Sequence, residues 1–335
     1  MLNKAVINLN ILKQNAKKIK QRLNGTRLCA VVKADAYGHG ASEISNALYS
    51  MVDCFAVALV EEGVSLRQSG IDKEILVLVP AHTSDYANAI RYNLTLTVQS
   101  VEELKNLEQA CQNSDGEIKV HIKINTGMNR LGASAHNLER ILDFASGLKR
   151  VKVVGGFSHY YNPQDKVCIE KSTSEFLLAN KLLKGYNKNI ISHISASGGF
   201  LQGQYFDMVR IGILLYGYLP YQCDFSVRPI MKVYAPVIKT REIEKGGHLL
   251  YGQEVLTKNQ NISLVRYGYA DGLPRKKING MVNNRCMDIC AISGELGCKY
   301  YPIMSDANLL ASEYGTISYE ILTKCAMRAQ KIYIN

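Results

Sequence analysis

Short runs of β-branched and other apolar residues alternate with amphipathic segments through the first two thirds of the chain. The eight strand-like runs are residues 28–32, 55–60, 75–79, 94–98, 118–124, 151–157, 190–194 and 208–215. Between most of them lie helix-favouring segments, residues 41–52, 61–69, 84–91, 100–112, 137–146 and 168–183. Strands joined by helical crossovers lie parallel, and eight of them close a barrel, so the pattern predicts an α/β protein with a (β/α)8 barrel of the TIM type. An open doubly wound sheet is the alternative, but the chain has no Gly-x-Gly-x-x-Gly turn to favour it.

The alternation stops after about residue 226, where strand-like runs follow one another with few helical segments between them. These runs are joined by Gly and Asn turns and span residues 233–240, 248–251, 262–267, 282–292 and 331–334. We therefore predict a barrel domain over residues 1–226 and a β-rich domain over residues 227–335. The first strand of the chain could pair with this second domain.

The composition is typical of a folded protein without a membrane segment. Of the 335 residues, 47% are hydrophobic and 21% are charged, which argues against a disordered chain. The sequence has no run of 18 apolar residues and no signal-peptide pattern, so we expect a cytoplasmic protein. Its nine cysteines form no Cys-x-x-Cys pair and show no metal-ligand spacing, which predicts reduced thiols and no metal site.

The net charge of +11 raises the question of a nucleic-acid partner. The lysines are dispersed along helical segments, as at Lys13, Lys17 and Lys20, and no arginine stripe is interleaved with aromatic residues. We therefore expect no nucleic-acid binding and attribute the charge to a solvated surface, with some attraction for an anionic cofactor or substrate.

Lys33 stands at the end of an apolar run and is followed at once by the turn Tyr37-Gly38-His39-Gly40. A strand that delivers a lysine from a hydrophobic wall lowers its pKa by desolvation, which makes a neutral, nucleophilic amine accessible. The turn offers a hydroxyl group and backbone N–H groups that suit a phosphate. A lysine that forms a Schiff base beside a phosphate site is what a pyridoxal 5′-phosphate (PLP) enzyme needs. The structural alternative is an ordinary strand-end lysine before a glycine turn.

Four further polar side chains lie at or just after the ends of other predicted strands, where the chemistry of such barrels takes place. Arg130 follows the fifth strand, His159 ends the sixth, Ser197 follows the seventh and Arg210 lies in the eighth. Each residue could also have a purely structural role. The arginines could form surface ion pairs, His159 could be a hydrogen-bonded core residue, and Ser197 could belong to a simple turn. Their coincidence at one rim favours a binding site.

Five blocks of the sequence, taken in order, resemble the alanine racemase family of fold-type III PLP enzymes. They are Val32-Lys33-Ala34-Asp35-Ala36-Tyr37-Gly38-His39-Gly40, Asn125-Thr126-Gly127-Met128-Asn129-Arg130-Leu131-Gly132, Met208-Val209-Arg210-Ile211-Gly212-Ile213, Gly268-Tyr269-Ala270-Asp271-Gly272 and Cys286-Met287-Asp288. The resemblance covers nearly the whole chain. It implies PLP as cofactor, a small amino acid as substrate and a homodimer whose active sites are completed across the subunit interface.

The resemblance implies two catalytic residues. Lys33 would hold PLP and move the α-proton on one face of the substrate, and Tyr251 of the partner subunit would act on the opposite face. Two acid/base groups on opposite sides of a planar centre are sufficient for racemisation. His159 and Arg210 would supply positive charge near that tyrosine.

The remaining roles also follow from the resemblance. Arg210 would face the pyridine nitrogen, and Arg130 and the backbone N–H of Met287 would bind the substrate carboxylate. Lys123 aligns with a lysine that is often carbamylated in the family and orients the arginine. Tyr269 would line the substrate channel, and Asp288 belongs to the supporting residues. The phosphate would be held by Tyr37, Ser197, Gly212 and Ile213.

Two positions depart from the family pattern. The family's Asn-Ser pair before the seventh-strand turn is Ala196-Ser197 in this chain. A tyrosine that narrows the family's substrate channel falls, by its spacing from Met287, on Met327, whereas Tyr319 comes eight residues too early. Because a flexible thioether defines a channel less sharply than a phenol, we expect weaker discrimination between alanine and serine.

The sequence thus predicts PLP-dependent interconversion of L-alanine and D-alanine, supplying D-alanine for peptidoglycan. Within the family, a serine racemase or a broad-specificity amino-acid racemase is the alternative. A fold-type III decarboxylase is disfavoured, because it places a carboxylate where Arg210 stands and uses a glycine triplet for the phosphate. A non-catalytic PLP-binding protein has a single barrel and lacks the β-rich domain that carries Tyr251.

Overall fold

The computed structural model of the protein describes residues 1–251, 255–275 and 284–335. The chain forms two compact units. The barrel unit comprises Lys13–Ala34 and Ala41–Val227, and the strand-rich unit comprises Met1–Leu12, Asp35–Gly40 and Arg228–Asn335. The chain therefore passes from one unit to the other and back within the segment that follows Lys33.

The barrel unit contains eight parallel strands, as predicted. Neighbouring strands pair in the order β8-β7-β6-β5-β4-β3-β2-β9. Two backbone hydrogen bonds join the outer strands of this order and so close the barrel: Asp207 N–H to Ser192 O, 2.9 Å, and Arg210 N–H to Ser195 O, 3.0 Å. The strands are β2 (Arg27–Val31), β3 (Cys54–Val57), β4 (Ile75–Val77), β5 (Thr95–Val98), β6 (Ile118–Lys123), β7 (Val151–Phe157), β8 (Ile191–His193) and β9 (Met208–Ile211).

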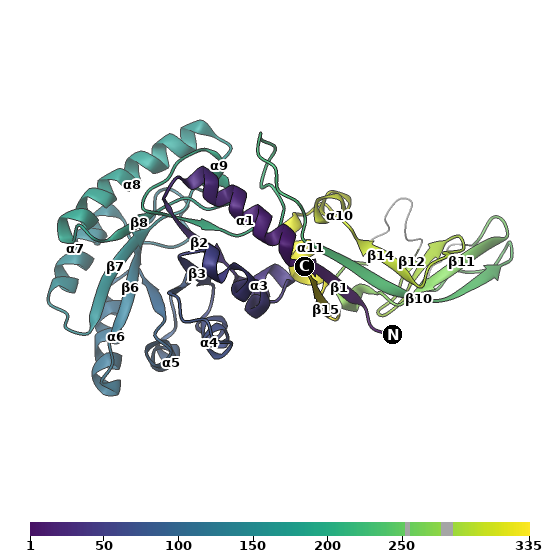
Figure 1. Cartoon of the computed structure of the whole chain (residues 1–335), viewed down its shortest axis with the longest axis horizontal. Helices are drawn as coiled ribbons and strands as arrows, with labels where there is room; N and C mark the ends of the chain where they lie inside the picture. The colour runs from purple at the N-terminus through teal and green to yellow at the C-terminus, as the bar shows by residue number, and fades with distance from the viewer. Residues whose placement is uncertain (252–254, 276–283) are drawn as a thin grey trace. The chain divides into compact units, whose positions relative to one another are not determined.

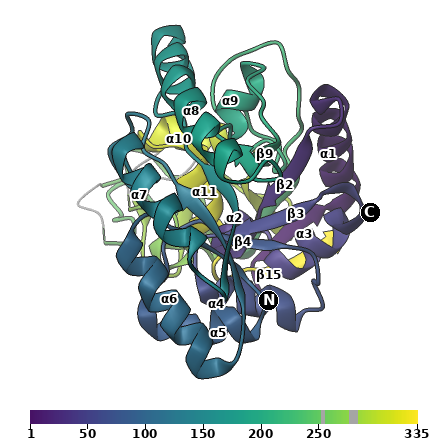
Figure 2. The ribbon, with the colours of Figure 1, turned by 90° about the vertical axis from the view of Figure 1, so that its left-hand side faces the viewer.

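Helices α4 to α8 follow one another around the outside of the barrel (Figure 2). The side-chain oxygens of Ser100, Ser134 and Asp165 cap the amino termini of α6, α7 and α8 by accepting backbone N–H groups of the first turn. No helix in the described ranges is long and apolar enough to cross a membrane. The helices of this unit are α1 (Leu9–Leu23, which begins in the strand-rich unit), α3 (Ala41–Leu48), α4 (Val60–Gln68), α5 (Tyr86–Arg91), α6 (Val101–Ser114), α7 (Ala135–Ser146), α8 (Lys166–Tyr186) and α9 (Ser197–Leu201).

The strand-rich unit is built on one sheet with the order β12-β13-β11-β10-β1-β15, in which β14 also pairs with β10. Strand β1 runs antiparallel to the long strand β10 and parallel to β15, so the two ends of the chain lie in the same sheet (Figure 1). The strands are β1 (Lys4–Asn8), β10 (Met231–Ile243), β11 (Gln260–Val265), β12 (Asn284–Arg285), β13 (Cys290–Ser293), β14 (Tyr300–Met304) and β15 (Gln330–Ile334).

Some elements of this unit differ from the prediction. The predicted strand 248–251 is present only as an isolated bridge between His248 and Val255. The predicted strand 282–292 is divided by a turn into β12 and β13, and residues 282 and 283 lie outside the described ranges. The sequence pattern did not predict helices α10 (Ala307–Tyr314) and α11 (Ser318–Cys325), which are only two turns long and therefore give a weak periodic signal.

Candidate active site

Lys33 begins a short left-handed turn, α2 (Lys33–Gly38), directly after β2. Residues Ala34 to Tyr37 have φ angles between 52° and 55°, and Gly38 has a φ of 81°. This conformation costs a residue other than glycine about 1–2 kcal/mol. A Cβ atom at Gly38 would lie 2.5 Å from the carbonyl oxygen of Leu322, so only glycine fits there. Strain of this kind next to a reactive side chain is typical of functional sites.

Glu62 anchors the beginning of this turn. Its carboxylate accepts a hydrogen bond from the backbone N–H of Ala34 (2.6 Å) and another from the N–H of Ala58 (2.7 Å). Burial lowers the pKa of Lys33, and the positive charge of Arg130 lowers it further, whereas Glu62 acts in the opposite direction. More of the Lys33 amine is therefore neutral near pH 7 than in an exposed lysine, as the sequence predicts.

Arg210 is buried at 3% exposure on β9, next to β2. Its guanidinium donates hydrogen bonds to the carbonyl oxygens of Ser158 (2.8 Å) and Ile194 (3.1 Å) and to Nδ1 of His193 (2.6 Å). Burial lowers the pKa of Arg210 to about 10, so the group stays protonated at neutral pH. These bonds hold a cation at the carboxyl ends of β7, β8 and β9.

Lys123 and His159 lie in the same electrostatic environment. Burial lowers the pKa of Lys123 to about 6, with further lowering by Arg210 and Arg130. Burial, followed by the charge of Arg210, also holds the pKa of His159 well below its ordinary value. The expectation that His159 supplies positive charge is therefore wrong, because its imidazole is neutral. The two arginines supply that charge, and together with Lys33 they make the site attractive for an anion.

Ser197 and Gly212 lie together where α9 and β9 meet. The backbone N–H of Gly212 donates to Oγ of Ser197 at 3.4 Å, and both Ser197 and Ile213 are buried. The turn requires its glycines: a Cβ atom at Gly198 would lie 2.4 Å from Pro163. A hydroxyl group next to backbone N–H groups suits a phosphate, which agrees with the predicted cradle.

Arg130 lies on the exposed loop that follows β6. The side chain of Asn125 shapes this loop, since its Oδ1 accepts hydrogen bonds from the N–H groups of Gly127 (3.2 Å) and Asn129 (3.0 Å). The charge of Arg130 acts on Lys33, Lys123 and His159. The barrel unit thus brings together the side chains that the sequence placed at its rim.

In the strand-rich unit, the motif of residues 268–272 packs on the motif of residues 286–288. The N–H of Tyr269 donates to the carbonyl of Cys286 (3.1 Å), and the N–H of Ala270 donates to the carbonyl of Met287 (3.0 Å). A Cβ atom at Gly268 would lie 1.9 Å from the same carbonyl oxygen of Met287, so glycine is required. The two motifs therefore form one backbone platform.

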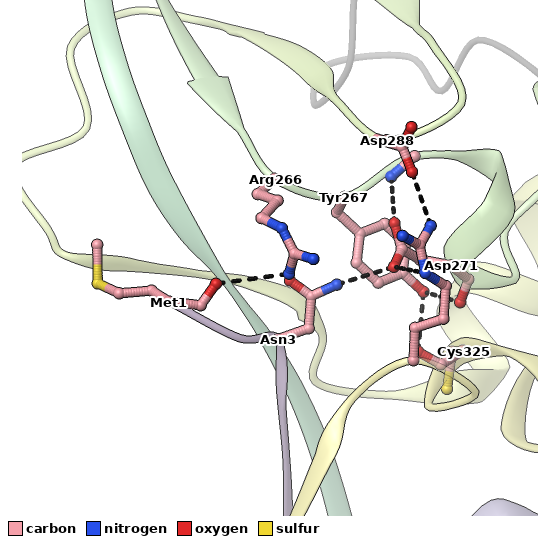
Figure 3. A network of polar contacts seen from close by, with 9 residues as sticks. Met1, Asn3, Arg266, Tyr267, Asp271, Asp288 and Cys325 are labelled. Atoms are coloured by element: carbon pink, nitrogen blue, oxygen red, sulfur yellow. Dashed lines mark hydrogen bonds and ion pairs between the residues drawn. The ribbon is translucent and has the colours of Figure 1, made fainter.

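Asp271 holds this platform in place (Figure 3). Its carboxylate accepts hydrogen bonds from the side chain of Asn3 (3.0 Å) and from the N–H of Gly268 (2.8 Å). Arg328 lies 3.7 Å from the same carboxylate and forms an ion pair of 2.7 Å with Asp288. Asp288, predicted as a supporting residue, thus ties the Met287 turn to the end of the chain.

The other predicted residues of this unit divide into exposed and buried side chains. Tyr251 is 81% exposed and lies two residues after Leu249, which is buried in a small cluster with Ile262 and Ala291. Met327 is 70% exposed, and Tyr269 and Met287 are also exposed. Tyr37 is buried, and its ring centroid lies 5.9 Å from that of Tyr319.

Sequence reasoning missed His121 and His193. Both are buried inside the barrel unit, and Nε2 of His193 lies 2.8 Å from Nδ1 of His121. One signal was available: His121 stands between the apolar residues Val120 and Ile122, and His193 directly precedes Ile194. A single histidine on a strand does not reveal a partner 72 residues away, however.

Two family models match this chain. One is described as "Alanine racemase, N-terminal domain" and matches residues 7–220, and the other is described as "Alanine racemase, C-terminal domain" and matches residues 230–333. An alanine racemase of Clostridium novyi is 32% identical over 370 aligned positions, which cover 98% of this chain and 95% of that protein.

Solved structures give the same result. The alanine racemase of Clostridium difficile 630 superposes with a TM-score of 0.94 at 29% identity, covering 100% of this chain and 96% of that one. Its complex with cycloserine superposes with a TM-score of 0.91 at the same identity and coverage.

Proposed function

Because this chain belongs to the alanine racemase family, and is therefore an amino-acid racemase, we propose that it interconverts L-alanine and D-alanine with PLP as cofactor. The observation that carries this proposal is the amine of Lys33, whose pKa is lowered by burial, in the same unit as the buried cation Arg210 and the Ser197–Gly212 turn. The product D-alanine would serve peptidoglycan synthesis in the cytoplasm.

The described residues fit PLP. A neutral lysine amine can bind its aldehyde, a guanidinium can donate to its ring nitrogen, and the turn of Ser197, Gly212 and Ile213 suits its phosphate, with Tyr37 as a further hydroxyl donor. When bound, the cofactor supplies the electron-withdrawing ring that makes the α-proton of an amino acid removable. A net positive site also favours a doubly anionic phosphate and a substrate carboxylate.

Lys33 and Tyr251 would share the proton transfers. The Nζ atom of Lys33 takes or returns the α-proton on one face of the substrate, and the hydroxyl of Tyr251 from the partner subunit of a homodimer does so on the other. The lowered pKa of Lys33 supports its role as a base near neutral pH. The 81% exposure of Tyr251 in the single chain supports a role toward a partner.

Arg210 would donate a hydrogen bond to the pyridine nitrogen without giving up its proton, because its pKa remains about 10. A ring that is not protonated withdraws electrons less strongly, which favours reversible proton exchange over side reactions. Arg130 and the backbone N–H of Met287 would bind the substrate carboxylate, and Lys123 would orient Arg130.

Met327 is the basis of the proposed relaxed specificity toward serine. The side chain is flexible and 70% exposed, so it gives the substrate channel no fixed polar group. We expect Met327→Tyr to lower kcat/KM for serine relative to alanine by about 3- to 10-fold, since one specific contact is worth about 1 kcal/mol. An unchanged ratio would contradict the assignment of Met327 to the channel.

The test is α-proton exchange in D2O. Purified protein with PLP and L-alanine should give α-deuterated alanine of both chiralities, as read by NMR and chiral chromatography. Lys33→Ala should lose both exchange and inversion. With L-alanine and D-alanine tested separately, Tyr251→Phe should lose inversion while keeping some exchange for the one enantiomer whose α-proton faces Lys33, because only one base remains. PLP bound without any exchange would instead indicate a PLP-binding protein without turnover.

A further inference from the structure

A file of polar side chains, all buried except for the partly exposed Glu74, crosses the interior of the barrel. It begins at Arg210 on β9, continues through His193 on β8 and His121 on β6, and ends at Glu74, which directly precedes β4. The separations are 2.6 Å from the Arg210 guanidinium to His193 Nδ1, 2.8 Å from His193 Nε2 to His121 Nδ1, and 3.6 Å from His121 Nε2 to Glu74 Oε1. Barrel interiors are ordinarily filled by apolar side chains, so such a file requires an explanation.

The contacts in this file allow one arrangement of the imidazole protons, which we call the order of the file. A guanidinium only donates, so Nδ1 of His193 accepts from Arg210 and the proton of this ring stands on Nε2. That N–H then donates to Nδ1 of His121, whose own proton must stand on Nε2. Nε2 of His121 faces the carboxylate of Glu74, which only accepts. The arginine end and the glutamate end therefore favour the same direction.

Both imidazoles are neutral, as this order requires. Burial and the positive charge of Arg210 hold the pKa of His193 well below its ordinary value and lower the pKa of His121 to about 3. The rings are also fixed by packing. Phe157 stacks on His193 with a centroid distance of 5.0 Å, and a Cβ atom at Gly155 would lie 2.4 Å from the ring of His121.

Glu74 is the end of the file at the opposite side of the barrel from the carboxyl ends of the strands. Within the described part of the chain, Nε2 of His121 has no partner at hydrogen-bond distance, and the Glu74 carboxylate, 3.6 Å away, is the acceptor that it faces. Arg27 lies 4.0 Å from the other oxygen of that carboxylate. Because the Glu74 side chain is 24% exposed, a substitution there disturbs the barrel core less than one at either histidine.

We propose that His121 and Glu74 are positioning residues for Arg210: they fix the tautomer of His193, so that its Nδ1 always accepts from the guanidinium. The guanidinium N–H groups of Arg210 that are not bonded to His193 then keep a constant direction toward a bound cofactor ring. This last consequence rests on the proposed function. The outer partners of metal-binding histidines are worth about 10- to 100-fold in affinity or activity, and we expect a value at the lower end of this range for the partners of His193.

The first test needs no cofactor. In two-bond ¹H–¹⁵N spectra of the full-length, histidine-labelled apoprotein, His121 and His193 should both show neutral rings protonated at Nε2. Arg210→Ala should keep this order, because Glu74 still directs it. Arg210→Ala combined with Glu74→Leu should give mixed tautomers. The matched control combines Arg210→Ala with Glu117→Leu, an exposed glutamate at the same place before β6, and should keep the order.

The second test uses the holoenzyme. With Arg210 in place the order of protons is kept, but Glu74→Leu leaves the Nε2–H of His121 without the acceptor that it faces, so the two imidazoles hold Arg210 less firmly. We expect kcat to fall by about 10-fold with KM changed by less than about twofold, whereas Glu74→Gln, which keeps an acceptor oxygen, should recover most of the rate. Three results would each overturn the proposal. They are a histidine ring of the file protonated at Nδ1 in the wild type, a double variant Arg210→Ala/Glu74→Leu that keeps both rings protonated at Nε2, and equal kcat values for Glu74→Leu and Glu117→Leu. If the wild type shows no α-proton exchange with alanine, the proposed function is wrong. The spectra of the apoprotein would still show which nitrogen of each histidine carries the proton.

Discussion

Lys123 is a buried lysine whose burial has an electrostatic cost. Burial lowers its pKa to about 6 from its ordinary value of 10.5, and its Nζ lies 4.2 Å from the ring centroid of Phe157. We expect Lys123→Met to raise the free energy of unfolding at pH 7 by more than about 1 kcal/mol in CO2-free buffer, since one pKa unit corresponds to about 1.4 kcal/mol.

The pH dependence of this effect has a definite sign. Between pH 6 and 10.5 the unfolded chain keeps the proton of Lys123 and the folded chain does not, so wild-type stability rises with pH across this window. Urea denaturation at pH 7 and pH 9.5 should therefore show a smaller advantage of Lys123→Met at the higher pH. Lys119→Met, on the exposed side of the same strand, is the control and should show little effect at either pH.

The same neutral amine should react with CO2. Attack of the Lys123 Nζ lone pair on CO2 releases a proton and gives a carbamate anion, which the charges of Arg210 and Arg130 would stabilise. Protein equilibrated with ¹³C-bicarbonate should show a carbamate resonance that disappears in Lys123→Met and persists in Lys119→Met. A spectrum without this resonance would leave Lys123 as an unmodified lysine.

The residues at the rim could be predicted from the sequence, because each stands next to a recognisable strand end. Lys33 and Arg210 are in this class. The file that supports Arg210 could not be predicted, because it joins three strands and one strand-preceding residue whose pairing depends on barrel closure. The neutrality of His159 also escaped prediction, since it arises from burial next to Arg210, a contact made only in the fold.

Among the elements, the barrel strands and most helices follow from hydrophobic periodicity, whereas the left-handed turn α2 does not. Its residues Ala34, Ala36 and Tyr37 rarely adopt positive φ, Asp35 does so only somewhat more often, and only Gly38 is a strong signal for it. The turn is imposed from outside, by Glu62 at its start and by the close backbone of Leu322 at its end. Tertiary structure therefore overrides local preference at the element that carries Lys33.

Relief of this strain is measurable at Ala34, which is exposed and has a φ of 52°. We expect Ala34→Gly to raise the free energy of unfolding by about 0.5–1 kcal/mol, because glycine avoids the left-handed penalty at a smaller entropic cost. Ala110→Gly, inside the right-handed helix α6, is the matched control and should lower stability by about 1 kcal/mol. Thermal denaturation of both variants decides the point, and a loss of stability at Ala34 would show that the turn is not strained.

At the scale of the whole molecule, the predicted site residues are divided between the two units. Lys33, Lys123, Arg130, His159 and Arg210 belong to the barrel unit, and Tyr37, Tyr251, Tyr269, Met287 and Met327 belong to the strand-rich unit. The sequence could suggest two domains from the change in pattern near residue 226. It gave no sign that Asp35–Gly40 joins the strand-rich unit, because this depends on contacts such as Tyr333 to the carbonyl of His39, 3.1 Å.

If each active site takes Lys33 from one subunit and Tyr251 from the other, two inactive variants should complement each other. A dimer of one Lys33→Ala chain and one Tyr251→Phe chain contains one site with both residues intact and one site with neither. Equal amounts of the two proteins, refolded together, should therefore regain about a quarter of wild-type activity, since half of the dimers are mixed and each has one working site. The same proteins mixed without refolding should stay inactive if their subunits do not exchange. Refolded mixtures that form dimers in sedimentation but recover no activity would show that Lys33 and Tyr251 of one chain serve the same site.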